Sequence, residues 1–590
     1  MLPADDGSGN RSTALRRYGP LGVIVVLLLV VAAVVLVGGG GGGDDDDKAS
    51  GASSGDLSWT SVEGVEPGAP APTGKMPVTY AEAKDAGEDG DHKWPDTCDT
   101  DKGAVKLPTV YALPCVPEFE GDNGGATSSG VTADSIKVVF YTADQGTDLT
   151  AILGAMGAND TPQQREDTIN QYLEVFTSVA QTYGRKVELT TFPASGLPND
   201  VVAAKADATD ILGMKPFAVI GGPPLDRGTF AQTLADGGVM CFDCAGAALP
   251  QALTLEMAPY VWGTLPVPDQ ILDLLTSWVN ALGDDAAAGG SADMAGGDLK
   301  GKPRKIGVIH FEQDPPVFKD LERERSDIAE VALMDTYVLD FPTLPAKAAE
   351  LIAEFKAEGI TTITFLGDPF MPIYLTQAAT EADYFPEWIF TGTALTDTNV
   401  FGRQYDQEQM AHAAGISELA APTDQDLQDF IRLYRWYFGD ESALPPAKAQ
   451  YALVAPAAAW LAAGIHMAGP DLTPETFARG LFRIPPGGGG PTTPRISYGN
   501  WGVSKTAVDY YGIDDAVEIW WDPDVRAEDE RGEMGTGAWR RSSDGERFLR
   551  TESPKSAIFE ESGSITVVDK LTGDDEPPSY PPPTGSPAAG

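Results

Sequence analysis

Positive charge, cysteine and histidine are all scarce in this 590-residue chain. It has 41 Lys and Arg residues against 87 Asp and Glu residues, which gives a formal net charge of −46. A surface that binds nucleic acid needs a basic patch, and the sequence shows none, so nucleic acid is excluded as a partner. The acidity itself indicates a well-solvated surface and identifies no partner.

The common catalytic and nucleotide-binding signatures are missing as well. The one Gly-x-Ser-x-Gly match, residues 51–55, lies in a Gly- and Ser-rich stretch that provides no strand before it and no helix after it. The four histidines show no metal-binding spacing, and the chain has no Walker-type loop and no dinucleotide fingerprint. We therefore expect no cofactor, no metal site and no enzymatic activity.

What the sequence does contain is two successive series of short apolar runs that alternate with helical patterns. Such runs predict parallel sheets that are covered by helices on both faces. We therefore predict an α/β fold of two lobes, each built on a doubly wound, mainly parallel sheet, with a ligand crevice at the carboxyl ends of the strands. The runs lie at residues 137–142, 186–191, 217–221 and 239–242 in the first series and at 305–311, 336–339, 362–366 and 387–391 in the second.

Near the N-terminus, residues 21–37 form an uninterrupted apolar run, preceded by arginines and followed by aspartates. This pattern predicts a single-pass transmembrane signal anchor over residues 18–38, with residues 1–17 in the cytoplasm and the body outside the cell membrane. A cleaved signal peptide is the alternative, because the length of the run suits both. In either case the body is exported.

The four cysteines, Cys98, Cys115, Cys241 and Cys244, form an even set, as expected for disulfides in an oxidising compartment. Pairing between neighbours in the sequence is preferred among the three possible connectivities. The spacing of Cys241 and Cys244 also matches a redox dithiol, and free thiols or a metal are further alternatives.

Changes in composition divide the chain into segments. We expect the two lobes to be preceded by a flexible stalk and followed by a disordered, Pro-rich tail, with a hairpin at residues 516–541 added to a sheet edge. The predicted boundaries are 39–103 for the stalk, 130–262 and 394–484 for lobe 1, 265–392 and 496–555 for lobe 2, and 574–590 for the tail.

The loops that follow the predicted strands carry polar and aromatic side chains suited to a small-molecule pocket. Aimed polar groups fix the orientation of a ligand, and aromatic rings provide the wall. The candidate ligand-binding residues are Asp144, Gln145, Asp226, Arg227, Asp243, Trp262, Phe318, Asp368, Phe370, Thr391 and Thr393.

The order of several segments resembles the two-lobed periplasmic binding proteins of the leucine/isoleucine/valine-binding type. The segments that carry the resemblance are residues 130–138 (GVTADSIKV), 218–222 (AVIGG), 234–239 (LADGGV), 259–264 (PYVWGT), 305–308 (KIGV), 361–369 and 384–392. The resemblance implies hinge closure around a small ligand and delivery to an ABC permease in the membrane. A ligand sensor without a transport role and a secreted α/β enzyme are the alternatives.

This chain departs from the family where a ligand amino acid would be held. Small hydroxyl residues are expected after the third and fourth strands, and the chain has 223–226 (PPLD) and 243–245 (DCA) there. The acidic residue expected after the last strand of lobe 2 is replaced by 391–393 (TGT), and the arginine often found at the first crossing is Gly263. A branched-chain amino acid is therefore disfavoured, and a cationic or polyhydroxy ligand is the hypothesis.

Overall fold

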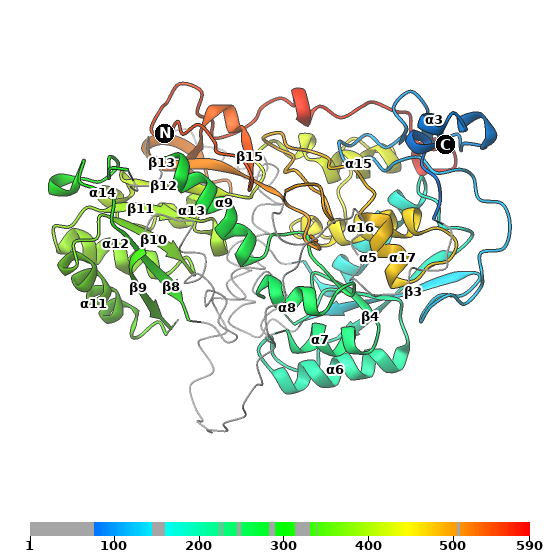
Figure 1. Cartoon of the computed structure of the whole chain (residues 1–590), viewed down its shortest axis with the longest axis horizontal. Coiled ribbons are helices and arrows are strands. Elements are labelled where there is room, and N and C mark those ends of the chain that lie inside the picture. Colours follow the sequence, from blue (N-terminus) through cyan, green and yellow to red (C-terminus); the bar gives the residue numbers. More distant parts are fainter. Residues whose placement is uncertain are drawn as a thin grey trace, which may run out of the picture.

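The computed structural model describes residues 76–143, 160–223, 226, 228–244, 249–282, 290–312, 331–338, 340–503 and 508–589. These residues form two α/β lobes, lobe 1 around a five-stranded sheet and lobe 2 around an eight-stranded one (Figure 1). The predicted α/β class and the parallel sheets are confirmed. The predicted anchor and the first part of the predicted stalk lie outside the described residues.

The sheet of lobe 1 is entirely parallel. Its strand order is β4-β3-β5-β6-β7. The first four strands in chain order coincide with the four runs predicted from the sequence, whereas the two-residue β7 was not predicted. The strands are β3 (Ser135–Thr142), β4 (Lys186–Pro193), β5 (Ala218–Ile220), β6 (Met240–Phe242) and β7 (Val261–Trp262).

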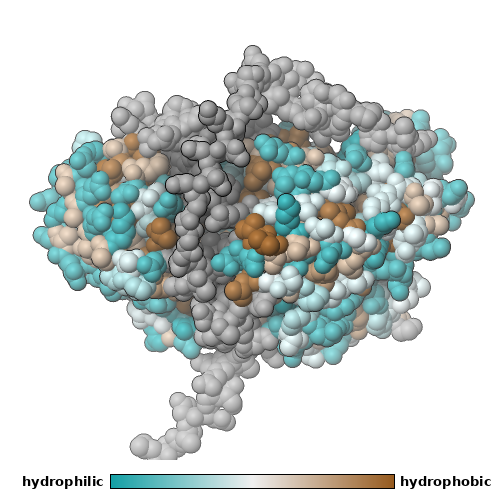
Figure 2. All heavy atoms as spheres, turned by 90° about the horizontal axis from the view of Figure 1, so that it is seen from below, coloured by the Kyte–Doolittle hydropathy of each residue, from teal (hydrophilic) through white to brown (hydrophobic). Residues whose placement is uncertain are grey.

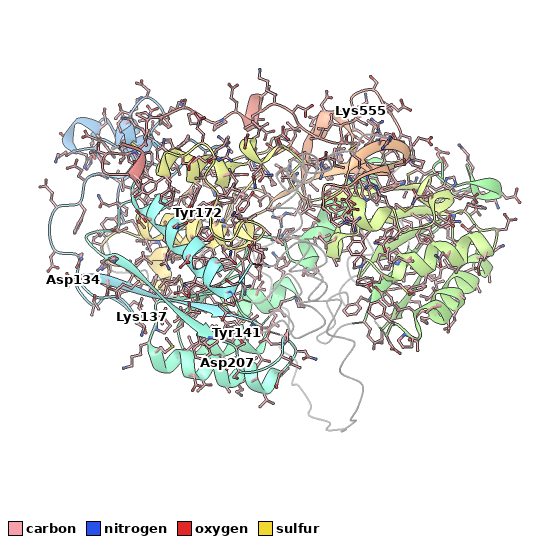
Figure 3. All side chains as sticks on the ribbon, turned by 180° about the vertical axis from the view of Figure 1, so that it is seen from behind. Asp134, Lys137, Tyr141, Tyr172, Asp207 and Lys555 are labelled. Carbon is pink, nitrogen blue, oxygen red and sulfur yellow. A yellow bond between two sulfur atoms is a disulfide. The ribbon has the colours of Figure 1, made fainter. Side chains whose placement is uncertain are left out.

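Helices cover both faces of this sheet because alternate strand residues point to opposite sides. Val138 and Phe140 belong to the core shared with α5 (Pro162–Thr177), α16 (Tyr451–Ala468) and α17 (Pro474–Leu481). Val139 and Tyr141 belong to the core shared with α6 (Val201–Met214) and α7 (Thr229–Asp236). Tyr141 reaches across to α6, where its hydroxyl donates to Asp207 Oδ2 over 2.9 Å (Figure 3).

Among the described residues, α16 is the one helix that is long and apolar enough to cross a membrane. Its residues are largely buried, and Ala457, Leu461 and Ile465 lie in the core of lobe 1. Here α16 is therefore a central packing element of lobe 1. Shorter helices of the same lobe are α8 (Gln251–Glu256) and α15 (Asp429–Phe438).

The sheet of lobe 2 has the same parallel core, in the order β9-β8-β10-β11-β12, extended by antiparallel strands. The predicted run at 336–339 captures only the end of β9, whose mixed polarity suits an edge strand. The strands are β8 (Ile306–Phe311), β9 (Val331–Tyr337), β10 (Thr362–Leu366), β11 (Glu387–Phe390), β12 (Ala413–Ser417), β13 (Asp515–Glu528), β14 (Met534–Arg541) and β15 (Arg547–Leu549).

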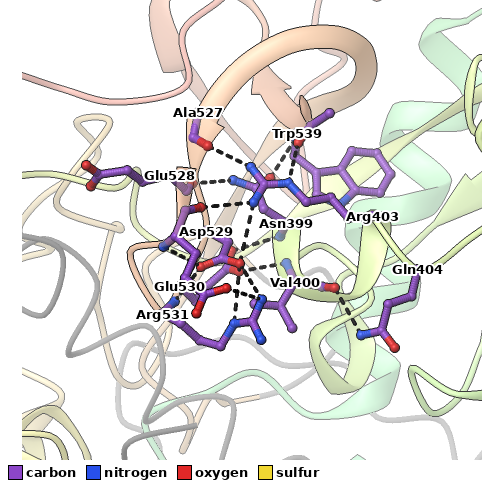
Figure 4. A network of polar contacts seen from close by, with 12 residues as sticks. Asn399, Val400, Arg403, Gln404, Ala527, Glu528, Asp529, Glu530, Arg531 and Trp539 are labelled. Atoms are coloured by element: carbon purple, nitrogen blue, oxygen red, sulfur yellow. Dashed lines mark hydrogen bonds and ion pairs between the residues drawn. The ribbon is translucent and has the colours of Figure 1, made fainter. Parts of the chain in front are cut away.

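One face of the lobe 2 sheet packs on α11 (Leu344–Ala357) and α12 (Met371–Glu381), and the other packs on α9 (Pro268–Ala281). The predicted edge hairpin is present as β13 and β14. Its tip is fastened to α13 (Asn399–Gly402), where the buried Glu530 carboxylate accepts the N–H groups of Asn399 and Val400 at 2.8 and 2.9 Å (Figure 4). The short helix α14 (Gln407–Met410) follows.

Three crossings join the lobes at residues 263–267, 418–423 and 509–514, and the C-terminal segment returns from lobe 2 to lobe 1 after residue 565. The predicted return to lobe 1 at residue 394 is therefore wrong, because β12 is the fifth parallel strand of lobe 2. The strand was not recognised because its residues are small. Small residues are required there, since a Cβ at Gly415 would stand 1.8 Å from the Phe390 carbonyl oxygen of the neighbouring strand. The predicted return to lobe 2 at residue 496 is also too early, since Ile496 and Tyr498 pack in lobe 1.

The later part of the predicted stalk, residues 76–103, is folded against lobe 1. It contains α3 (Tyr80–Ala86) and the small β1 (Cys98–Asp99) and β2 (Ala104–Val105) pair. The Cys98–Cys115 disulfide closes the segment, which confirms that pairing. His466 of α16 accepts the Gln181 N–H at Nδ1, and its Nε2 contacts the Pro114 carbonyl oxygen. Burial lowers the pKa of His466 to about 4, so the ring is neutral where it links lobe 1 to the loop closed by the disulfide.

The predicted disordered tail also packs on the body. Asp575 is buried, and its carboxylate accepts the Thr492 N–H and the Thr493 hydroxyl. Further along, the Tyr580 hydroxyl donates to Asp99 at 2.8 Å, beside the N-terminal segment. The abundance of proline predicted disorder here, but these side-chain contacts hold the chain in place.

Candidate functional site

The candidate site lies at the edge of the lobe 2 sheet where β10, β11 and β12 end. In a doubly wound sheet, the carboxyl ends of the strands line the ligand crevice. The second crossing leaves this edge directly after β12, and β7 of lobe 1 runs directly into the first crossing, so corresponding edges of both sheets adjoin the joint between the lobes. On the face seen in Figure 2, a few clusters of hydrophobic side chains interrupt a largely hydrophilic surface.

Two carboxyl groups, Asp397 and Glu418, are buried together at this edge, and we call them the acidic pair. Asp397 is 7% exposed and Glu418 is 6% exposed. The Ser417 hydroxyl donates to Asp397 Oδ2 at 2.5 Å. Within the described part of the chain, Asp397 Oδ1 and Glu418 Oε1 have no hydrogen-bond partner. A buried oxygen of this kind is expected to be satisfied by water or by a ligand.

Gly392 brings the acidic pair together. It follows β11 with φ of 74°, a conformation that favours glycine. A Cβ at this position would stand 3.0 Å from Glu418 Oε2 and 3.2 Å from Asp397 Oδ2, so both carboxyl groups lie against its backbone. The flanking Thr391 and Thr393 hydroxyls are 2.7 Å apart. The structure thus places these two predicted residues in the turn against which both carboxyl groups of the acidic pair lie.

Burial controls the charge of the pair. It raises the pKa of Glu418 to about 8, and the neighbouring Asp397 carboxylate adds to the rise. It also raises the pKa of Asp397 to about 6, against the opposing effect of the Ser417 hydroxyl and Arg541. At neutral pH the pair therefore retains one proton, mainly on Glu418, and carries one negative charge on Asp397.

Arginines brace the backbone behind the pair. Arg547 donates to the carbonyl oxygens of Glu418 and Leu419 at 2.8 and 3.0 Å and forms an ion pair with Asp515 at 2.9 Å. Arg541 Nη2 donates to the Ala420 carbonyl oxygen at 3.2 Å. The second crossing is thereby fixed to the strands that bring the chain back into lobe 2.

The first and third crossings run together as a two-stranded ribbon. The Gly263 N–H donates to Tyr510, and the Ile513 N–H donates to Thr264. Next to this ribbon, Arg550 Nη2 lies 2.6 Å from Asp509 Oδ2 and 3.0 Å from Asp514 Oδ1. Gly263 is needed where a side chain would collide, since a Cβ would stand 2.3 Å from the Tyr511 ring. A side chain at position 263, including the arginine that the sequence resemblance suggested, is thus excluded on steric grounds.

Two predicted ligand residues of lobe 2 have structural roles. Asp368 is 3% exposed, and its carboxylate accepts the Tyr337 hydroxyl and the N–H groups of Phe370 and Met371 at the start of α12. The Phe370 ring packs against Phe341. Asp368 therefore serves as a helix cap whose hydrogen-bonding capacity is used within the lobe.

The described candidates of lobe 1 are likewise engaged inside the protein. Asp226 is buried and accepts N–H groups at the start of α7, including that of Gly228 at 3.2 Å. Asp243 accepts the Thr264 N–H at 2.9 Å and so ties the loop after β6 to the first crossing. Trp262 is 1% exposed and lies in the core of lobe 1, so its ring is not a cleft wall. The remaining candidates, Asp144, Gln145, Arg227 and Phe318, lie outside the described residues.

Cys241 and Cys244 are joined by a disulfide across the end of β6, with their Cα atoms 5.8 Å apart. All four cysteines are therefore paired with their sequence neighbours, as preferred from the sequence. The turn is tightly packed, because a Cβ at Gly222 would stand 2.4 Å from the Cys244 carbonyl oxygen. This disulfide shapes the carboxyl edge of lobe 1.

Neither member of the acidic pair is among the ligand-binding residues predicted from the sequence. The signal for Glu418 was a polar Ser-Glu dipeptide directly after the apolar run at 413–416, but that run is made of small residues and was not recognised as a strand. Asp397 follows β11 by several residues, and the turn that brings it back to the sheet edge depends on Gly392. No local pattern indicates that return.

Comparisons with known proteins show similarity at the level of structure. No family model matches the chain, and no curated protein matches it. The structure is similar to a periplasmic binding protein type 1 from Bordetella pertussis, at 13% identity and a TM-score of 0.43 over 68% of this chain and 100% of that one. It is also similar to the branched-chain amino acid transporter substrate-binding protein LivJ from Streptococcus pneumoniae, in complex with isoleucine, at 12% identity and a TM-score of 0.41 over 69% of this chain and 100% of that one. A third similar structure is an ABC transporter solute-binding protein from R. palustris in complex with 4-hydroxybenzoate, at 12% identity and a TM-score of 0.44 over 72% of this chain and 100% of that one.

The raised pKa of Glu418 predicts a pH-dependent stability. Between the usual carboxyl pKa near 4.5 and the folded value of about 8, the unfolded chain loses this proton while the folded chain keeps it, so stability falls as pH rises. Glu418→Gln has no such proton to lose. We expect its melting temperature to exceed that of the wild type by roughly 5 °C at pH 8.5 and to show no gain at pH 4.5, measured by scanning calorimetry.

Glu546→Gln, at an exposed position, is the matched control and should show neither effect. A difference between Glu418→Gln and the wild type that stays the same at both pH values would contradict the assignment of a buried, protonated Glu418.

Proposed function

We propose that this protein is an extracellular solute-binding protein that captures a small polar ligand between its two lobes. Two sheets with the same parallel strand order, joined at their carboxyl edges by three crossings, support this proposal. Such an arrangement permits the lobes to close on a ligand by small rotations at the crossings. The observation that carries the proposal is the acidic pair, buried at the edge that adjoins those crossings.

The chemistry of the pair favours a ligand with a cationic nitrogen. An ammonium group donates hydrogen bonds to carboxylate oxygens, and charge-assisted bonds of this kind are the stronger class. The free oxygens of Asp397 and Glu418 accept such donors, and the hydroxyl of Thr393, which is only partly buried, lies in the adjoining turn. Binding of a cation would replace the proton that Glu418 holds in the free protein.

A binding role, without catalysis, agrees with the sequence. The two cysteines near the carboxyl edge of lobe 1 are joined in a disulfide, and the Gly-x-Ser-x-Gly match lies far from either sheet in the sequence. The residues placed around the acidic pair are threonines, a serine, two arginines and main-chain groups. These groups are suited to holding a polar ligand.

The ligand class is tested by thermal-shift screening of the chain against polyamines, amino acids, amides, sugars and aromatic acids. We expect compounds with a cationic nitrogen to raise the melting temperature, by an amount equivalent to about 2.7 kcal/mol at a hundredfold excess over Kd. Asp397→Asn and Glu418→Gln should each weaken the binding of such a compound by roughly tenfold, while Glu546→Gln leaves it unchanged.

No stabilisation by any compound of this panel would count against the binding function. Stabilisation that is unaffected by both substitutions in the acidic pair would retain the function but reject this site.

We further propose that the protein is tethered to the cell membrane and hands its ligand to an ABC importer. The apolar run at residues 21–37, with arginines on its N-terminal side, supports the tether, and the resemblance in segment order supports the importer. Fractionation of cells that express the full chain should place it with the membranes, and removal of residues 1–43 should abolish this association. Recovery of the full chain from the culture medium would contradict the tether.

A further inference from the structure

A cavity of about 350 Å³ lies away from the acidic pair, where the N-terminal segment meets lobe 1. One side is formed by the start of α3 and by the loop that the Cys98–Cys115 disulfide closes, including Tyr111. The other side is formed by Trp460 of α16, the stretch after α17 that includes Arg483, and Tyr498. Its volume lies within the range of small-molecule sites.

The cavity has aromatic walls in a fixed arrangement. The Trp460 ring makes edge-on contacts with Tyr111 and Tyr498, with ring centroids 6.4 and 5.4 Å away. Hydrogen bonds lock the two tyrosines, since Tyr111 donates to the Pro494 carbonyl oxygen at 2.7 Å and Tyr498 donates to that of Gly263 at 3.2 Å. Pre-positioned rings of this kind provide apolar walls at little cost in conformational entropy.

Two hydrogen-bond donors of the lining residues are buried without an acceptor in the described part of the chain. They are Trp460 Nε1 and Arg483 Nη1. Trp460 is only 8% exposed. The other terminal nitrogen of Arg483 is already engaged, by the Pro77 carbonyl oxygen at 3.0 Å and Glu82 at 2.5 Å. Leaving a buried donor unsatisfied is costly, and both of these groups call for an acceptor.

We propose that this cavity is a second ligand site, which takes a small molecule with a flat apolar body and a carboxylate. The aromatic walls hold the body, and the carboxylate accepts from Trp460 Nε1 and Arg483 Nη1. The required charge is opposite to that at the acidic pair, where an anion is repelled by Asp397. The two sites therefore select different ligands, and each can be tested independently of the other.

The test is isothermal titration calorimetry of the full-length chain with 2-naphthoate as the probe. We expect saturable binding at one site, and weaker binding of 2-naphthalenemethanol, which has the same ring system without the charge. Arg483→Lys, which keeps a positive charge for Glu82 but removes Nη1, should weaken 2-naphthoate binding roughly tenfold. Trp460→Phe keeps an aromatic ring without the N–H and should weaken it roughly fivefold.

Trp501→Phe, at a 41% exposed tryptophan, is the matched control and should bind as the wild type does. A second readout is the NMR resonance of the Trp460 indole N–H. It is assigned as the indole signal that is missing from the spectrum of Trp460→Phe, and in the wild type it should shift on addition of 2-naphthoate. Absence of saturable binding below about 10 mM, a range in which even weak specific ligands bind, would overturn the proposal. Binding that neither substitution weakens, or that leaves the Trp460 resonance unmoved, would overturn it as well.

Discussion

More carboxyl groups than arginines are buried where the chain crosses between the lobes, and this imbalance governs the chemistry of the joint. Arg547 pairs with Asp515, and Arg550 is shared by Asp509 and Asp514. Taking a carboxylate out of water without full compensation costs several kcal/mol, so some of these groups must keep a proton. Burial raises the pKa of Asp514 and of Glu418 to about 8 each, which identifies where those protons reside.

The two protonated carboxyls differ in what surrounds them. Asp514 accepts a hydrogen bond from the Ser497 hydroxyl and forms an ion pair with Arg550. Its partners are therefore already inside the protein, and it stabilises the crossing. Glu418 keeps an oxygen that no described group reaches, at an edge where ligands of doubly wound sheets bind. A ligand cation would donate a hydrogen bond to the free oxygen and would stabilise the ionised form of Glu418. The electrostatics of the joint are thereby connected to a binding function.

The sequence predicted the scaffold more successfully than the site. Long β-branched runs such as 137–142 and 362–366 identified their strands, because apolar periodicity reports burial directly. β12 was missed because its small residues carry a weak apolar signal, and that error displaced a domain boundary and hid Glu418. Aspartates after strands were predicted to bind ligand, yet Asp226 and Asp368 cap helices, a role that depends on the helix that follows and not on the strand before it.

On binding, a ligand cation is expected to take the place of the proton on Glu418. Isothermal titration calorimetry at pH 7 in buffers of different ionisation enthalpy measures it directly, because a proton released on binding is taken up by the buffer. With any compound that the protein binds through a cationic nitrogen, we expect release of about one proton per ligand, because the pKa of Glu418, about 8 in the free protein, should fall below 7 on pairing. A binding enthalpy that is the same in all buffers would contradict this exchange of a proton for a cation.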